Sequence, residues 1–384
     1  MGRKLMPSKT SFRVIHVFPN SARLSCGPCN AVMAFMESQL RHGLDVRAVG
    51  PVDNHIPPDR SQPVAHLLLK EFDLAAGDFC SQMLAQAEGA RSLFHFHGIS
   101  PWSDLLAKQL TAAAVPYVFT SHGQLNFHGP VHAFKKFVYV SFVSPFIRQA
   151  AGLHFLTRRE KERFRFILPL WCKPHLIQPN LVPLPDVEAV VPLSRAQSGL
   201  PDNAFVFAYL GRLDVENKGL DLLLDAFAQI ASHAETGLIL IGPDFKNGRQ
   251  FLEQRARRLG CENKVRFLGP QNGPAKWSAL KMADAFVFPS RWEAFGIALA
   301  EAVGMGLPAI VSDKINIAPE LAARRAALIS PLSPAALAGA MRKLMKDAAL
   351  HSLADAGRLW VKEACSHESA GPRFDAFYES VLQG

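Results

Sequence analysis

Two acidic residues, Glu293 and Glu301, interrupt the mostly apolar stretch RWEAFGIALAEA at positions 291–302. The two acids are eight positions apart, which on an α-helix is about 80° beyond two full turns, so the two carboxylates do not share one helical face. The apolar run 285–290 reads as a strand, which places Glu293 in a strand-to-helix loop and Glu301 about two turns into the next helix. Two such acids can hold the hydroxyl groups of one polar ligand, and two surface glutamates are the alternative.

Phe295 and Gly296 lie between the two acids, where the helix is expected to begin. The first amides of a helix lack an intrahelical acceptor and lie at the positive end of the helix dipole, which favours a bound phosphate. A phosphate at the helix start, with a carboxylate on each side for hydroxyl groups, suits a sugar nucleotide.

The loop GRLDVENKG, residues 211–219, adds two cations, Arg212 and Lys218, after another expected strand. Arginine offers a planar fork of donors and lysine a compact charge, which together suit a diphosphate. A solvated surface loop is the alternative. Because this loop and the Glu293 loop are expected to open at the same end of one sheet, the two features support each other.

Two segments of the first half, 92–98 and 116–123, each read as a short strand that ends in His-Gly. His122 ends the second segment and is a candidate for a site at the strand end. His97 and His95 face the same side of their strand, because they are two residues apart. For these two histidines a structural role is the favoured interpretation, and for His122 it is the alternative.

The order of apolar runs predicts an α/β fold with two doubly wound domains facing each other across a cleft. A proline-rich stretch, 181–201, separates two series of strands and helices and reads as the linker. We expect the domains to span 1–190 and 191–362. The expected strands are 12–19, 44–51, 92–98, 116–123, 152–157 and 175–180 in the first series, and 205–213, 237–242, 264–269, 285–290, 307–313 and 326–330 in the second.

The motifs GRL…KGLDLLLDAF, IGP, RFLG, PSRWEAFGIALAEAVGMGLPAIVSD and TSHGQLN resemble those of the retaining glycosyltransferases of family 4, which have the GT-B fold. The resemblance covers residues from about 12 to 380 and is strongest over 205–313. It implies that a C-terminal helix, 363–384, packs back on the N-terminal domain. It also implies hexosyl transfer from a nucleotide sugar, linked to UDP or GDP, to a glycan or polyprenyl-linked acceptor in cell-surface polysaccharide synthesis.

The resemblance also implies roles for the donor-binding residues. Arg212 and Lys218 would bind the diphosphate and balance the charge of the leaving group. Glu301 would bind the ribose hydroxyls and Glu293 those of the donor sugar. The backbone of Phe295 and Gly296 would meet the sugar or the phosphate.

At the reacting face, the resemblance implies that His122 reaches the transferred sugar. Gly27 would match the glycine-rich first loop that lets the acceptor and the diphosphate approach. Here the chain has Cys26-Gly27-Pro28 where the family often has Gly-Gly, so the shape of this loop departs from the pattern. The chemistry implied is front-face transfer, in which the leaving phosphate oxygen takes the acceptor proton.

No metal or other cofactor is expected, because the chain has no Asp-x-Asp motif and the cations of the 211–219 loop can serve the same electrostatic end. The lone pair Cys26 and Cys29 lacks the further ligands of a zinc site. Three alternatives stay open: a nucleotide-sugar epimerase of the same fold, a sucrose-type synthase with a soluble acceptor, and a non-catalytic partner of another transferase.

The net charge of +9 is unevenly distributed, and the stretch 132–173 holds nine lysines and arginines against Glu160 and Glu162. Lys135 and Lys136 lie beside aromatic residues, which suits contact with an anionic membrane surface. Core helices with basic outer faces are the alternative, and no nucleic acid partner is expected. The chain has no apolar run of ~20 residues and no signal-peptide pattern, so we expect it in the cytoplasm, with the capacity to dock on the inner face of the plasma membrane.

Overall fold

The computed structural model describes residues 11–18, 27–51, 69–72, 79–100, 102–124, 145–232, 235–347 and 352–384. The chain divides into two compact units, Met1–Leu181 with Ala364–Gly384, and Val182–Glu363. The border between the units lies between residues 181 and 182, at the start of the proline-rich stretch. The sequence predicted this border after residue 190.

Among its described residues, the first unit holds a seven-stranded parallel sheet with the strand order β3-β2-β1-β4-β5-β6-β7. The strand order reverses between β1 and β4, which is where ligands bind in doubly wound sheets. Strand β3 was not predicted from the sequence, because it is short and half of its residues are charged. The strands are β1 Phe12–Val17, β2 Asp45–Pro51, β3 Leu69–Phe72, β4 Arg91–His97, β5 Tyr117–Thr120, β6 Gly152–Phe155 and β7 His175–Ile177.

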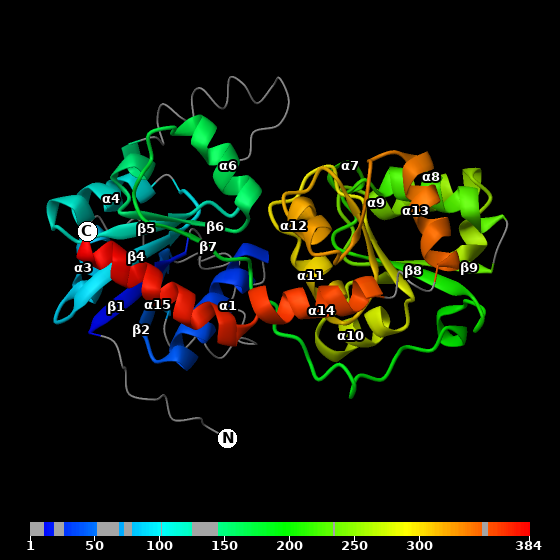
Figure 1. Cartoon of the computed structure of the whole chain (residues 1–384), viewed down its shortest axis with the longest axis horizontal. Coiled ribbons are helices and arrows are strands. Elements are labelled where there is room, and N and C mark those ends of the chain that lie inside the picture. Colours follow the sequence, from blue (N-terminus) through cyan, green and yellow to red (C-terminus); the bar gives the residue numbers. More distant parts are fainter. Residues whose placement is uncertain are drawn as a thin grey trace. The chain divides into compact units, whose positions relative to one another are not determined.

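Helices cover both faces of this sheet (Figure 1). One face packs against α3, α4 and α6 through a buried apolar cluster. The opposite face carries α1 and, from the C-terminal end of the chain, α15, which lies against α1. The helices are α1 Gly27–His42, α3 Phe79–Leu84, η2 Ala85–Ala87, α4 Ser103–Ala112, α6 Arg158–Ile167 and α15 His367–Gln383.

In the second unit, the described residues form a six-stranded parallel sheet with the order β10-β9-β8-β11-β12-β13. The order reverses between β8 and β11. The strands are β8 Phe205–Leu210, β9 Thr236–Ile241, β10 Val265–Gly269, β11 Ala285–Phe288, β12 Ala309–Ser312 and β13 Leu328–Ser330. The helices are η3 Ala196–Ser198, α7 Val215–Lys218, α8 Leu220–Ala231, α9 Gly248–Arg258, η4 Glu262–Lys264, α10 Gly273–Lys281, α11 Ile297–Gly304, α12 Ala318–Ala323, α13 Pro334–Lys346 and α14 Ser352–Ala364.

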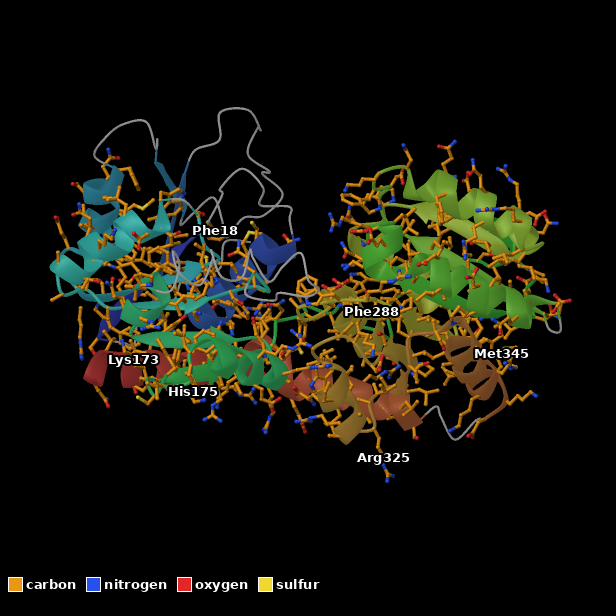
Figure 2. All side chains as sticks on the ribbon, turned by 90° about the horizontal axis from the view of Figure 1, so that it is seen from above. Phe18, Lys173, His175, Phe288, Arg325 and Met345 are labelled. Carbon is orange, nitrogen blue, oxygen red and sulfur yellow. The ribbon has the colours of Figure 1, made fainter. Side chains whose placement is uncertain are left out.

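The central strands of the second unit read as continuous apolar runs because helices cover both faces of their sheet. All six residues of β9 are buried, as are all four of β11. Phe288, labelled in Figure 2, ends β11 and is 2% exposed. The α/β, doubly wound architecture predicted from the sequence is confirmed in both units.

Candidate functional site

The predicted site residues of the second unit lie on the segments that follow β8 and β11, where the strand order reverses. Strands β8 and β11 pair in parallel, with Phe207 opposite Ala285 and Ala208 opposite Phe286. The carboxyl ends of parallel strands meet at one edge, so the loop after β8 and the loop after β11 are neighbours. The structure therefore brings the two candidate loops together at a position where doubly wound sheets bind ligands.

Lys218 and Glu293 form an ion pair between these two loops. Their side chains are 16% and 18% exposed, so water screens the pair only in part. The prediction that Lys218 lies in a loop is wrong in detail. Lys218 instead ends the short helix α7, and Gly219, with φ of 65°, separates α7 from α8.

Close packing at Gly219 sets the position of Lys218. A Cβ atom at Gly219 would lie 2.2 Å from the carbonyl oxygen of Pro289, in the loop that leads to Glu293. The backbone of the α7–α8 junction thus touches the β11 loop, which only glycine allows at this position.

Arg291 fastens the β11 loop to α7 and α8. Its guanidinium donates to both carboxylate oxygens of Asp221, at 2.8 and 2.7 Å, and to the carbonyl oxygen of Glu216 at 2.6 Å. Burial opposes ionisation of Asp221, but the hydrogen bonds and charge of Arg291 outweigh it and lower the pKa of Asp221. This clamp holds the Glu293 loop against the segment that carries Lys218.

Helix α11 begins at Ile297, two residues later than predicted. Gly296 is its N-terminal cap, with φ of 92°. A Cβ atom there would also lie 3.0 Å from the Phe288 ring. The helix-start amides that favour an anion therefore belong to residues 297–299, and Phe295 precedes the cap with its side chain buried against Trp360.

Glu301 lies about one turn into α11, where two turns had been predicted. The Lys276 ammonium donates to Oε1 of Glu301 at 2.6 Å. The side chain of Glu301 is 13% exposed and that of Lys276 is 19% exposed. Burial raises the pKa of Glu301, and the charge and hydrogen bond of Lys276 act against that rise. The sequence analysis missed Lys276, because no spacing rule connects a lysine of α10 to an acid 25 residues further along.

Arg212 lies in the loop after β8, with its guanidinium 4.6 Å from the centre of the Phe245 ring. A guanidinium nitrogen is 3.7 Å from the Asp214 carboxylate. Arg212 lines a cavity of about 720 Å³, and within the described part of the chain the lining includes neither Lys218 nor the two acids. The structure thus pairs Lys218 with Glu293 and Glu301 with Lys276. It places Arg212 on the wall of a cavity that none of these four residues lines.

In the first unit, His122 follows β5 in a tight turn. Its backbone has φ of 46°, in the left-handed region that residues other than glycine rarely adopt. Its Nε2 atom lies 3.0 Å from Nδ1 of His97. Burial, with a smaller contribution from His154, lowers the pKa of His122. Such local strain is frequent at functional sites, and the role predicted for His122 stays a prediction.

A buried acid that the sequence analysis did not use, Glu160, supports the turn that carries His122. The Ser121 hydroxyl donates to Glu160 Oε1 at 2.5 Å, and the Leu156 amide donates to Oε2 at 2.7 Å. Glu160 is 5% exposed, and burial raises its pKa. Its sequence context, a basic helix, gave no sign of a buried carboxyl group.

Two predictions fall at the edge of the described residues. Gly27 is the first residue of α1, so it lies at a helix start, and the loop before it, with Cys26, lies outside the described residues. Lys135 and Lys136 also lie outside them. Cys29, the other cysteine of the CxxC pair, is buried.

Two doubly wound α/β units in one chain are the architecture of the GT-B glycosyltransferases. The family model described as Glycosyl transferases group 1 matches residues 190–360, and the model described as Glycosyl transferase 4-like domain matches residues 27–171. The chain belongs to glycosyltransferase family 4.

Curated relatives match parts of the chain. A D-inositol 3-phosphate glycosyltransferase of Catenulispora acidiphila is 30% identical over 201 residues, which are 50% of this chain and 48% of the relative. A phosphatidyl-myo-inositol mannosyltransferase of Mycobacterium leprae is 33% identical over 138 residues, 35% of this chain and 36% of the relative. The chain thus spans less than half the length of these relatives.

Solved structures match the whole chain in fold. Sucrose-phosphate synthase from Thermosynechococcus elongatus has a TM-score of 0.75 at 18% identity and covers 97% of this chain and 99% of its own. HepE from Anabaena, solved in complex with UDP, has a TM-score of 0.76 at 18% identity and covers 97% of this chain and 100% of its own. At this identity the likeness shows the shared fold.

Proposed function

We propose that this chain is a retaining glycosyltransferase that moves a hexosyl group from a nucleoside-diphosphate sugar to a glycan or lipid-linked acceptor in cell-surface polysaccharide synthesis. The observation that carries the proposal is the arrangement around the start of α11. Glu293 lies just before the helix start and Glu301 one turn after it, and a lysine pairs with each acid. The neighbouring solved structure of HepE with UDP supports a uridine nucleotide as the first donor to test.

The charges of this region suit the leaving group. Transfer breaks the bond between the anomeric carbon and the phosphate oxygen and builds positive character on the sugar ring. Negative charge then develops on the diphosphate, and the helix start, Lys218 and Arg212 would stabilise it most in the transition state. These groups supply the positive charge that a metal ion supplies in other sugar-nucleotide enzymes, so the proposed reaction needs none.

We propose front-face transfer as the course of the reaction, as the family resemblance implies. The acceptor oxygen bonds to the anomeric carbon on the face that the phosphate leaves, and its proton passes to the leaving phosphate oxygen, which gives retention. Glu293 is already paired with Lys218, which makes its carboxylate a poor nucleophile and a good hydrogen-bond acceptor for sugar hydroxyls.

Variants of the two pairs test the proposal. Glu301→Gln and Lys218→Met should each lower transfer about 10²–10³-fold with UDP-glucose or GDP-mannose, the loss that follows removal of one transition-state contact. Lys108→Met, at an exposed ion pair in the first unit, is the control and should keep wild-type turnover. Wild-type turnover in both site variants would refute the assignment.

Product analysis separates the alternatives. An epimerase would convert the nucleotide sugar without any acceptor, and a sucrose-type synthase would use a soluble sugar or sugar phosphate. A non-catalytic partner would bind a donor and release no nucleotide. The proposed transferase releases nucleotide in proportion to the glycan or lipid-linked acceptor that it modifies.

We further propose that the first unit contacts an anionic membrane surface through the turn after α6. Leu170 in this turn is 91% exposed, and the ammonium of Lys173 (Figure 2) lies 5.4 Å from the centre of the Trp171 ring. The turn lines a cavity of about 330 Å³ that also includes Arg148. An exposed apolar tip with basic neighbours fits the interface of an anionic bilayer.

Vesicle sedimentation tests this contact. No described helix is long and apolar enough to cross a bilayer. The chain should sediment with phosphatidylglycerol vesicles and not with phosphatidylcholine vesicles. Leu170→Glu should weaken binding, whereas Val191→Glu, at a residue 76% exposed in the second unit, should not. Equal binding of all three proteins would contradict the proposal.

A further inference from the structure

A row of buried polar side chains crosses the sheet of the first unit on the face that α1 and α15 cover. Strand register places His16 opposite His95, His97 opposite Thr120, and Thr120 opposite His154. None of these five side chains is more than 2% exposed. A buried polar group is costly unless it forms hydrogen bonds, so the partners of each group can be traced.

Two residues from the covering helices complete the row. Gln39 of α1 lies with Oε1 2.8 Å from His16 Nε2, and its Nε2 donates to the Tyr378 hydroxyl at 3.1 Å. Tyr378 of α15 lies with its hydroxyl 2.8 Å from His95 Nδ1. The C-terminal helix thus joins the histidines of β1 to those of β4.

The result is one continuous chain of hydrogen bonds that begins at His122 and ends at a backbone carbonyl. Nε2 of His122 lies 3.0 Å from Nδ1 of His97, whose Nε2 lies 2.7 Å from Nδ1 of His16. Nε2 of His95 lies 2.7 Å from the Thr120 hydroxyl oxygen, which lies 2.8 Å from Nδ1 of His154. Nε2 of His154 lies 2.8 Å from the carbonyl oxygen of Gln178.

The carbonyl end sets the direction of every bond. A carbonyl oxygen only accepts, so Nε2 of His154 carries the hydrogen and its Nδ1 accepts. The Thr120 hydroxyl therefore donates to His154 and accepts from Nε2 of His95. Nδ1 of His95 is then an acceptor and receives the hydroxyl hydrogen of Tyr378.

The directions of the remaining hydrogen bonds are fixed as far as His122. The Tyr378 oxygen accepts from the Gln39 amide, whose oxygen accepts from Nε2 of His16. Nδ1 of His16 therefore accepts from Nε2 of His97, and Nδ1 of His97 accepts from Nε2 of His122. All five histidines carry their hydrogen on Nε2.

This assignment requires neutral imidazoles, and the surroundings favour them. Burial lowers the pKa of His16 and of His154 to about 4. Burial also lowers the pKa of His95 and His97 well below the usual value, and the neighbouring histidines add to the effect. Near neutral pH the imidazole rings of these hydrogen-bonded histidines are therefore uncharged.

A metal ion is the competing explanation for this cluster. His16, His95 and His97 offer ligand atoms within 4.8 Å of one another. However, the six ring nitrogens of these three residues all take part in the hydrogen bonds given above, so a metal ion would have to break the chain.

We propose that this series of hydrogen bonds holds His122 as the Nε2–H tautomer. Nδ1 of His122 is then left to accept a hydrogen bond from a hydroxyl group of the substrate. Gln39 and Tyr378 are then positioning residues, because they act on His122 through His16 and His97. The functional consequence rests on the proposed transferase activity, whereas the tautomer itself does not.

Nitrogen NMR of histidine-labelled protein tests the tautomer directly at pH 7.5. The five rings should give the nitrogen shifts and long-range couplings of neutral Nε2–H imidazole, with each ring assigned by its His→Gln variant. An Nδ1–H or doubly protonated His122 in the wild-type protein would overturn the proposal. Stoichiometric zinc in the purified protein would overturn it as well.

Tyr378→Phe tests the relay, because it removes the link that transmits direction from the Gln178 carbonyl. His95 and His154 should keep the Nε2–H tautomer, since Thr120 and the carbonyl still orient them. His16, His97 and His122 should become tautomer mixtures, because Gln39 can then flip. Tyr117→Phe is the matched control, since this buried hydroxyl donates to the Phe146 carbonyl outside the chain. An unchanged His122 in Tyr378→Phe would refute the relay.

Kinetics then links the tautomer to transfer. Tyr378→Phe should lower kcat several-fold in the wild-type background and have no further effect once His122→Ala is present. Additive effects in the double variant would refute the positioning role. Absence of transfer in wild-type protein with Nε2–H tautomers intact would count against the proposed function and leave the tautomer assignment standing.

Discussion

The ion pair of Glu301 and Lys276 shows how a site acid can keep its charge while largely shielded from water. Both side chains are less than a fifth exposed. Burial raises the pKa of Glu301, and Lys276 acts against that rise. Removing one partner of such a pair leaves a buried charge without compensation, which costs more than removing both.

We therefore expect Lys276→Met to destabilise the second unit by about 2 kcal/mol, and to weaken donor binding because Glu301 becomes easier to protonate. Urea unfolding and the KM for the donor measure the two effects. The double variant Lys276→Met/Glu301→Gln should recover most of the stability and none of the transfer. A double variant less stable than Lys276→Met would contradict this account.

At the scale of elements, the contact between the α7–α8 junction and the β11 loop positions Lys218. Gly219 has a left-handed backbone, and a Cβ atom would overlap the Pro289 carbonyl oxygen at 2.2 Å. The strain of the left-handed backbone and the overlap with Pro289 can be measured separately, because Gly260 shares only the first. Its φ is 67°, against 65° at Gly219, and no heavy atom lies within 4 Å of its Cβ position.

Gly219→Ala should therefore cost at least about 2 kcal/mol more than Gly260→Ala, which has only the left-handed backbone to accommodate. It should also lower transfer, because Lys218 moves away from Glu293 when the two loops separate. Unfolding free energies and turnover of both variants provide the comparison. Equal stabilities would mean that the junction adjusts freely and does not position Lys218.

At the scale of the whole molecule, the buried histidines make the two units differ in their response to acid. Unfolded histidine binds a proton near pH 6.5, whereas His16 and His154 bind one only near pH 4 in the folded chain. Between these values the unfolded state binds more protons, so stability rises with pH. Each of the two residues should lower the free energy of unfolding by about 1.4 kcal/mol at pH 5.5 relative to neutral pH. Glu160, whose pKa is raised, offsets part of this loss of stability.

Hydrogen exchange resolves this prediction by unit. After correction for intrinsic rates, amides of β4 and β5 should lose protection between pH 7.5 and 5.5, while amides of β8 and β9 should change little. His16→Gln, which keeps hydrogen-bonding groups and cannot titrate, should reduce the loss in the first unit. Parallel changes in both units would show that the acid response does not come from the histidines.

Much of the fold follows from the sequence because its signals are local. Apolar runs and their spacing predicted both parallel sheets, with β3 as the strand that was missed, and the family resemblance supplied roles for residues such as Glu301 and His122. Parallel sheets gather the carboxyl ends of their strands at one edge, so strand ends alone pointed to the candidate loops. The predicted cleft between the two units stays a prediction.

The partners of those residues were decided only by the tertiary structure. Lys276 neutralises Glu301 from 25 positions away, and Tyr378 reaches His95 from 283 positions away. A hydrogen bond requires atoms within about 3 Å, a condition that local periodicity does not express and that only packing satisfies. The sequence by itself therefore determined which residues lie at the strand ends, and the packing of α10, α1 and α15 decided their charge and protonation, because each depends on a neighbour that is remote in the chain.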